Sequence, residues 1–99
     1  QPGMIVSNEP GYYKTGAYGI RIENLVAVKD VEIEGADRKY LEFETLTLAP
    51  IDLACVETSL LTETDKQWLN DYHRRVRETV GPNVDEETRA WLEQATRAI

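Results

Sequence analysis

Cysteine is nearly absent from this chain, which has Cys55 alone among its 99 residues. One cysteine excludes an intramolecular disulfide, so we expect a protein of a reducing compartment, the cytoplasm. No apolar run approaches the roughly 20 residues of a membrane span, and the chain does not open with the basic and apolar segments of a signal peptide. The sequence also has no internal repeat and no low-complexity tract.

Cationic side chains are scarce as well. Eleven Lys and Arg residues stand against 18 Asp and Glu residues, a formal net charge of −7. Nucleic acids and anionic membranes bind cationic surfaces, so we expect no nucleic acid and no membrane among the partners. With 99 residues, 41% of them apolar, the chain has room for one modest core and therefore for one domain at most.

The first half of the chain has the pattern of β-strands and the second half that of helices, which predicts an α+β fold. In the second of three extended segments four even positions are apolar, Ile20, Ile22, Val26 and Val28, while Arg21 and Glu23 share the odd, polar face. A glycine-containing stretch at residues 14–18 precedes that segment and predicts a hairpin. The extended segments are residues 4–8, 19–28 and 40–48.

Apolar residues change parity inside the third predicted strand. Leu41 and Phe43 lie on one face, and Leu46 follows at the opposite parity. A β-bulge near Glu44 and Thr45 would produce this change. Coverage of both faces of the strand would also do so, because strict alternation is then not needed. The sequence leaves both explanations open.

Two helices are predicted in the second half. Thr62 is typical of a helix N-cap, with Asp65 three residues later, and Gly81 followed by Pro82 ends this first helix. The second helix begins near Asp85. Apolar residues recur at helical spacing in both: Trp68, Leu69, Tyr72, Val76 and Val80 in the first, and Trp91, Leu92, Ala95 and Ile99 in the second.

Some side chains of the helical half allow more than one interpretation. We interpret Trp68 and Trp91 as core anchors, with burial in a subunit interface as the alternative. His73 stands beside two arginines and is interpreted as a helix-surface residue. Cys55 lies in an apolar stretch and is interpreted as a small buried residue rather than as a nucleophile.

Two glutamates carry the functional signal. Glu9 lies in Glu-Pro-Gly-Tyr-Tyr at residues 9–13, and Glu23 lies in Gly-Ile-Arg-Ile-Glu-Asn at residues 19–24. A hairpin between these segments can bring both carboxylates together as oxygen ligands of a metal. Read alone, Glu9 is more typical of a solvated turn than of a metal ligand, and Glu23 is more typical of an exposed ion pair with Arg21. The hairpin tyrosines are interpreted as packing residues, or alternatively as the rim of a substrate cleft: Tyr12, Tyr13 and Tyr18.

These motifs resemble a known family. The segments at residues 2–13, 19–24 and 46–52 resemble the C-terminal end of Xaa-Pro aminopeptidases, the aminopeptidase P group of the creatinase-like, pita-bread metallopeptidases. The predicted helix from residue 61 to residue 73 is similar to the C-terminal extension of the larger, cytosolic form. The resemblance covers nearly the whole chain.

The resemblance implies a fold and a division of the chain. Residues 1–52 would be the C-terminal portion of the pita-bread catalytic domain, an antiparallel sheet. Residues 53–99 would be a C-terminal helical extension that packs on it, so that both parts form one structural unit.

The resemblance also implies a dinuclear site, commonly with manganese, built from two aspartates, one histidine and two glutamates. Only the glutamates match this sequence. Glu9 would bind one metal ion and exchange a proton with the attacking water, which makes it the catalytic residue. Glu23 would bridge both ions, and Arg21 would orient the carboxylates. His73 does not match the ligand histidine.

The implied activity is removal of the N-terminal residue from a peptide whose second residue is proline. Because the other three ligands have no match, we expect a fragment of the catalytic domain that is inactive alone, and the sequence leaves open whether it binds metal by itself. Its partners would be the proline-containing peptide and the remainder of the catalytic domain, and a homodimer stays open. The alternatives are a prolidase-type dipeptidase and a non-catalytic interaction or dimerisation module derived from the same fold.

Overall fold

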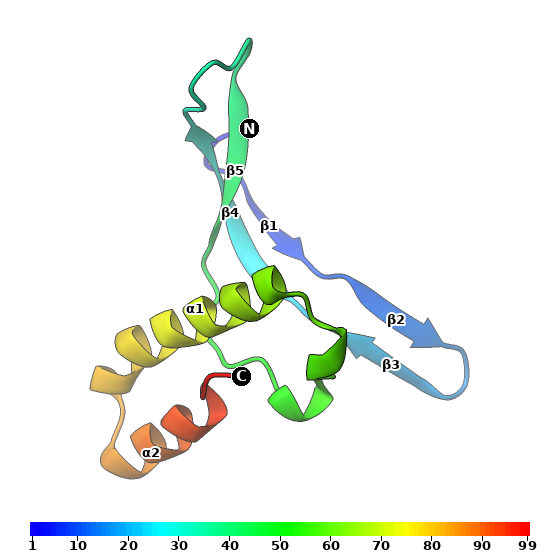
Figure 1. The fold of residues 1–99 in the computed structure, drawn as a ribbon, viewed down its shortest axis with the longest axis vertical. Coiled ribbons are helices and arrows are strands. Elements are labelled where there is room, and N and C mark those ends of the chain that lie inside the picture. Colours follow the sequence, from blue (N-terminus) through cyan, green and yellow to red (C-terminus); the bar gives the residue numbers. More distant parts are fainter. The chain divides into compact units, whose positions relative to one another are not determined.

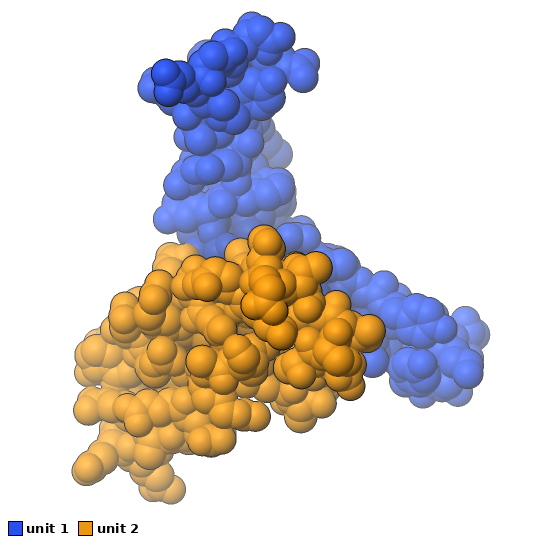
Figure 2. All heavy atoms as spheres, viewed as in Figure 1, with its two compact units in different colours: residues 1–47 blue, residues 48–99 orange.

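A computed structural model describes all residues, 1–99. The chain divides into two units, residues 1–47 and residues 48–99, which are considered separately below (Figure 2). The first unit holds every strand and the second every helix, as the α+β pattern of the sequence predicts (Figure 1). The strands are β1 (Ile5–Asn8), β2 (Gly11–Lys14), β3 (Tyr18–Arg21), β4 (Asn24–Val31) and β5 (Tyr40–Thr45).

All strand pairs in the first unit are antiparallel. β4 lies between β1 and β5 in a three-stranded sheet, and β2 pairs with β3 in a hairpin. The turn of that hairpin lies within the predicted stretch, and Gly16 in it has a φ of 72°. This left-handed conformation suits glycine because it has no Cβ.

The single strand predicted at residues 19–28 is wrong, because the structure has two strands there. β3 ends at Arg21 and β4 begins at Asn24. In the segment opposite, Glu9 and Pro10 separate β1 from β2 in the same way. Proline has no backbone N–H and cannot donate to the ladder. The carbonyl of Pro10 still accepts a hydrogen bond from the Ile22 N–H, at 3.1 Å, so the two chains stay side by side through the interruption.

A bulge follows β5, but not at the predicted position. β5 keeps a regular register with β4 as far as Thr45, which is opposite Val26. Directly afterwards the N–H groups of Leu46 and Thr47 both point to the carbonyl of Leu25, at 2.8 and 3.4 Å. Two residues opposing one is the pattern of a β-bulge. The prediction of a bulge near residues 44 and 45 is therefore displaced, and the strand ends before residue 48.

The first unit buries little of its apolar surface by itself. Val26, in the central strand, is its one buried hydrophobic residue. Large side chains on both faces of the sheets are exposed. They include Ile5, Tyr12, Tyr13, Ile20, Leu25, Leu41 and Phe43.

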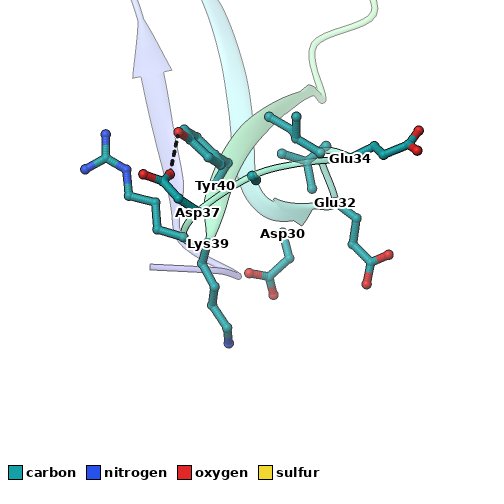
Figure 3. A pocket seen from close by; sticks show the side chains of 10 residues that line it. Asp30, Glu32, Glu34, Asp37, Lys39 and Tyr40 are labelled. Atoms are coloured by element: carbon teal, nitrogen blue, oxygen red, sulfur yellow. Dashed lines mark hydrogen bonds between the residues drawn. The ribbon is translucent and has the colours of Figure 1, made fainter.

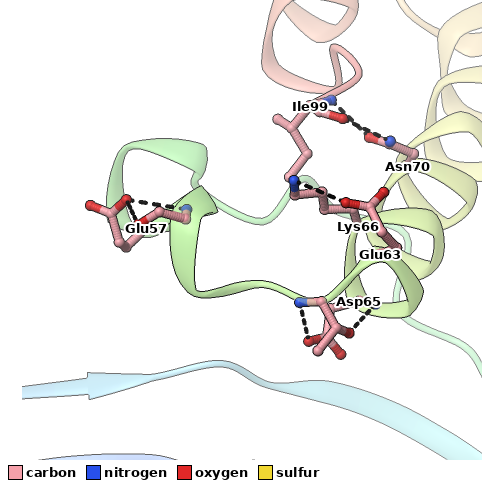
Figure 4. Close-up of polar contacts among 8 residues, drawn as sticks. Glu57, Glu63, Asp65, Lys66, Asn70 and Ile99 are labelled. Atoms are coloured by element: carbon pink, nitrogen blue, oxygen red, sulfur yellow. Dashed lines mark hydrogen bonds and ion pairs between the residues drawn. The ribbon is translucent and has the colours of Figure 1, made fainter.

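The second unit contains α1 (Glu63–Val80) and α2 (Glu86–Ala95), with single turns of 3-10 helix at Leu53–Cys55, Thr58–Leu60 and Gly81–Asn83. The predicted N-caps Thr62 and Asp85 are both confirmed. At Thr62 the hydroxyl accepts from the Asp65 N–H at 3.1 Å, and the Asp65 carboxylate accepts from the Thr62 N–H at 3.0 Å (Figure 4). These hydrogen bonds, the backbone one first, lower the pKa of Asp65.

The core of the second unit lies between α1 and α2. Leu69, Tyr72 and Val76 of α1 are buried together with Leu92 of α2. The sequence stripes predict all four. Partly buried residues that pack against them are Leu48, Ile51, Leu53, Val80 and Ile99.

The interpretation of the tryptophans as core anchors is wrong. Trp68 is 49% exposed and Trp91 is 62% exposed. Trp68 stacks on the Tyr72 ring, with centroids 5.3 Å apart and planes 5° apart, so it covers the edge of the core from outside. Each tryptophan directly precedes a buried leucine, so in this unit the leucines occupy the core side of the helices.

His73 is also misplaced by the sequence interpretation, because it is fully buried. Its Nε2 accepts a hydrogen bond from the Ile51 N–H at 3.0 Å, while its Nδ1 has no partner. Next to it, the Tyr72 hydroxyl donates to the Ala49 carbonyl at 2.7 Å. Two neighbouring residues of α1 thus hold the segment that leads into the helical unit.

Cys55 is exposed rather than buried, which corrects the third interpretation. It ends the first 3-10 turn, where its Sγ lies 3.9 Å from the Asp52 carboxylate.

The last residues of the chain are held against α1 by side-chain hydrogen bonds. Asn70 exchanges two with the backbone of Ile99, at 3.2 and 3.0 Å (Figure 4). No helix has the combination of length and apolar character needed to cross a bilayer.

Candidate functional site

Glu9 and Glu23 lie in the break between two antiparallel strand pairs, β1 with β4 and β2 with β3. On one side of them Asn8 is opposite Asn24, and on the other side Gly11 is opposite Arg21. The register is the same on both sides, so Glu9 falls opposite Glu23. Residues directly opposite in an antiparallel pair project from the same face, with Cβ atoms about 4.5–5.5 Å apart. The carboxylates therefore share one face.

Arg21 lies beside this acidic pair on the same face. Its Nε is 2.9 Å from a carboxylate oxygen of Glu23, and both side chains are partly exposed. A hydrogen bond with Tyr13 and then the charge of Glu23 raise the pKa of Arg21, to which Glu9 adds a smaller contribution.

The three hairpin tyrosines are divided between two faces. Tyr13 is an odd-numbered residue on the face of Glu9, Glu23 and Arg21. Tyr12 and Tyr18 lie on the other face, with ring centroids 6.0 Å apart. The sequence interpretation treated the three alike and did not connect Tyr13 with Arg21. The strand register of the structure places Tyr13 opposite Gly19 and therefore diagonal to Arg21.

The donor set suits a hard divalent cation in part. Two opposed carboxylates offer the oxygen ligands that magnesium and manganese prefer. No group of three or more His, Cys, Asp or Glu side chains in the structure is arranged to hold a metal ion. Two carboxylates are fewer oxygen ligands than these cations usually take, and His73 and Cys55 belong to the other unit.

A hollow at the other end of the first unit is a separate feature. It is enclosed by the connection between β4 and β5 and carries acidic side chains, among them Asp30, Glu32 and Glu34 (Figure 3). The Tyr40 hydroxyl donates to Asp37 there at 3.5 Å. Glu9 and Glu23 do not line it, so this hollow and the two glutamates are different places in the fold.

Known families match both parts of the chain. Residues 39–99 match the model of the C-terminal region of peptidase M24, and residues 1–30 match that of metallopeptidase family M24. The match over residues 1–30 includes Glu9, Glu23 and Arg21.

Individual relatives extend over nearly the whole chain. A protein described as "Probable Xaa-Pro aminopeptidase P" from Coprinopsis cinerea is 50% identical over 98% of this chain and 16% of its own length. Aminopeptidase P2 from Arabidopsis thaliana is 49% identical over 100% of this chain and 14% of its own length. The chain thus spans about one sixth of the relatives it matches.

A solved structure is similar across the same range. The X-prolyl aminopeptidase from Caenorhabditis elegans, described as a cytosolic enzyme with a di-nuclear active site, is 35% identical. The similarity covers 100% of this chain and 17% of that one, with a TM-score of 0.89. This confirms the predicted α+β class with the antiparallel sheet portion of a pita-bread fold. The chain therefore belongs to metallopeptidase family M24, in which it corresponds to a C-terminal part of the Xaa-Pro aminopeptidases.

Proposed function

We propose that this chain supplies two metal ligands, Glu9 and Glu23, to a dinuclear aminopeptidase that removes the N-terminal residue from peptides with proline in second place. The common register of the strand pairs on either side of Glu9 and Glu23, which sets these residues opposite each other, is the observation that carries this proposal. The names of the relatives and the di-nuclear site of the similar structure support it.

Each residue has a separate task in this proposal. Glu9 and Glu23 would hold two divalent ions, manganese in our proposal, which when bound would polarise a peptide carbonyl and lower the pKa of a water. Glu9 is the proton carrier, because its carboxylate is not held by Arg21. Glu23 would be the ligand that the two ions share, and Arg21 would fix its orientation through the 2.9 Å contact.

The chain is one part of the catalytic assembly. We propose that residues 1–52 belong to the catalytic domain and residues 53–99 to a helical extension, and that further ligands come from a longer protein. The chain alone is then inactive. The longer enzyme would be cytoplasmic, since the Caenorhabditis elegans protein is described as cytosolic. Analytical sedimentation would distinguish a monomer from a homodimer.

The test is manganese-dependent release of the N-terminal residue from an Xaa-Pro-Xaa peptide by the longer protein, with the 99-residue chain assayed beside it. We expect turnover only by the longer protein, and its loss in Glu9→Gln and Glu23→Gln, which keep side-chain size and remove the charge. Glu34→Gln, in the exposed β4–β5 connection, is the matched control and should keep full activity.

Each other outcome has a defined meaning. Turnover by the 99-residue chain would contradict the proposed need for further ligands. Cleavage of Xaa-Pro dipeptides in preference to the longer peptide would indicate a prolidase-type dipeptidase. A longer protein that binds manganese but cleaves neither substrate would favour the interaction module.

A further inference from the structure

Two glycines of the β2–β3 hairpin lie under the ring of Tyr13. Gly19 is directly opposite Tyr13, and Gly11 is two residues before it on the same face of the strand pair. A Cβ built on Gly19 would lie 2.7 Å from Cδ1 and 3.1 Å from Cε1 of Tyr13. A Cβ on Gly11 would lie 2.8 Å from the Tyr13 hydroxyl and 3.0 Å from its Cε2. The ring therefore occupies the space of both missing side chains.

Backbone conformation does not explain these two glycines. Positive φ angles occur at Gly3, Gly16 and Gly35, where an added Cβ would meet nothing within 4 Å. Gly11 and Gly19 show the reverse, because their φ angles are open to other residues and their Cβ positions are filled. What they contribute is room above the strands.

That room determines where the Tyr13 hydroxyl ends. The ring extends from Gly19 to Gly11, and Gly11 is paired with Arg21. The hydroxyl thus ends above Gly11, beside Arg21, whose Nε lies 2.9 Å from a carboxylate oxygen of Glu23. Three cross-strand pairs form one row on this face: Gly19 with Tyr13, Gly11 with Arg21, and Glu23 with Glu9.

We propose that Gly11 and Gly19 are positioning residues, which seat the Tyr13 ring flat on the hairpin so that its hydroxyl holds Arg21 against Glu23. We call the placement of the Tyr13 ring over Gly11 and Gly19 the seat. Its role in catalysis rests on the proposed function, whereas the seat itself does not. A side chain at either position lifts the ring, releases Arg21 and loosens the carboxylate that it orients.

Gly19 is the better position to test, since its added Cβ meets side-chain atoms of Tyr13 alone, whereas at Gly11 it also comes within 2.9 Å of the Ile20 carbonyl. In the longer enzyme we expect Gly19→Ala to lower kcat roughly ten- to a hundredfold, because small misplacements of a reacting geometry cost that much. KM should stay within about twofold, since substrate binding does not depend on the orientation of Glu23 alone.

The seat predicts non-additivity with Tyr13. If Gly19→Ala acts by lifting the ring, it should have no further effect on kcat in a Tyr13→Ala background. An equal loss of kcat in both backgrounds would overturn the proposal. Gly81→Ala is the control, because its Cβ would approach other atoms no closer than 4.0 Å and should leave kcat unchanged.

A spectroscopic measurement separates the seat from the proposed function. The side-chain Nε–H resonance of Arg21, followed by ¹⁵N NMR, should shift in Gly19→Ala and in Tyr13→Phe, and should not shift in Gly81→Ala. An Arg21 resonance unmoved by Gly19→Ala would overturn the seat even if the enzyme is active as proposed. If the wild-type longer protein cleaves no Xaa-Pro peptide, the proposed function fails, and the resonance still decides the seat.

Misfolding of the single variant would also be decisive. If Gly19→Ala does not fold by far-ultraviolet circular dichroism, the Tyr13→Ala, Gly19→Ala double variant removes the clash. Recovery of the folded spectrum in the double variant supports the seat, and failure to recover overturns it.

Discussion

His73 makes the stability of the helical unit depend on pH. Burial, and then the charge of Arg77, lower its pKa below the ordinary value near 6.5. Its Nε2 accepts the Ile51 N–H, which the imidazole can do only while that nitrogen carries no proton. Protonation would place a charge among buried side chains and break this hydrogen bond. The folded unit therefore keeps His73 neutral.

The sign and size of the effect follow from linkage. Below pH 6.5 the unfolded chain binds a proton at His73 that the folded chain does not, so the free energy of unfolding falls as the pH falls. If the buried imidazole stays neutral throughout, the loss between pH 7.5 and pH 5.5 is at most about 1.4 kcal/mol. At about 4–8 °C per kcal/mol for a domain of this size, the melting temperature would fall by up to roughly 6–11 °C.

Urea unfolding followed by tryptophan fluorescence measures this directly. Both tryptophans, Trp68 and Trp91, lie in the second unit, so the signal reports that unit alone. His73→Gln is the matched variant, because its side-chain carbonyl can accept the Ile51 N–H and does not titrate. All other titrating groups are common to both proteins, so their contributions cancel in the difference.

We expect the wild-type protein to lose stability relative to His73→Gln as the pH falls from 7.5 to 5.5. Equal pH dependence in both proteins would refute the reasoning, since it would mean that His73 takes up its proton in the folded state as readily as in the unfolded chain.

Three further predictions concern the core, the helix cap and the exposed sheet. Leu92→Ala should destabilise the second unit by about 2–4 kcal/mol because Leu92 is 3% exposed, whereas Leu60→Ala, at a side chain 81% exposed, should change little; equal urea midpoints would contradict this. Thr62→Ala should lower the free energy of unfolding by about 1 kcal/mol, because it removes the N-cap hydroxyl. Thr62→Ser, the control, should retain most of this stabilisation. The isolated chain should self-associate through the exposed apolar residues of its sheets, and a monomer in sedimentation at high concentration would count against this.

Local signals in the sequence predicted the helices well because caps and stripes act within a few residues. Thr62 with Asp65, Asp85, and the end of α1 at Gly81 all stand where the sequence places them. The strands were predicted less well. The alternating pattern predicted one strand that continued through Glu23. The structure shows why the pairing is interrupted there, because the segment opposite contains a proline at residue 10.

The sequence proposes the residues of the candidate site, which stay a prediction, and does not give the contacts around them. The motifs single out Glu9, Glu23 and Arg21, and the antiparallel register then places the glutamates opposite each other. That Tyr13 reaches Arg21 depends on a ring lying over Gly11 and Gly19. No spacing rule reports such a contact, because it depends on which way a side chain turns.

By itself, the sequence determined the α+β order of this protein, its helix caps, four core residues and the three polar residues of the candidate site. The tertiary structure alone decided which bulky or titratable side chains are buried: His73 is enclosed, while Trp68, Trp91 and Cys55 are exposed. The physical reason is that helical periodicity defines a stripe about 100° wide, and residues at its edges become core or surface according to what packs against them. For His73 the deciding neighbour is the backbone of Ile51, which is distant in sequence and adjacent only in the fold.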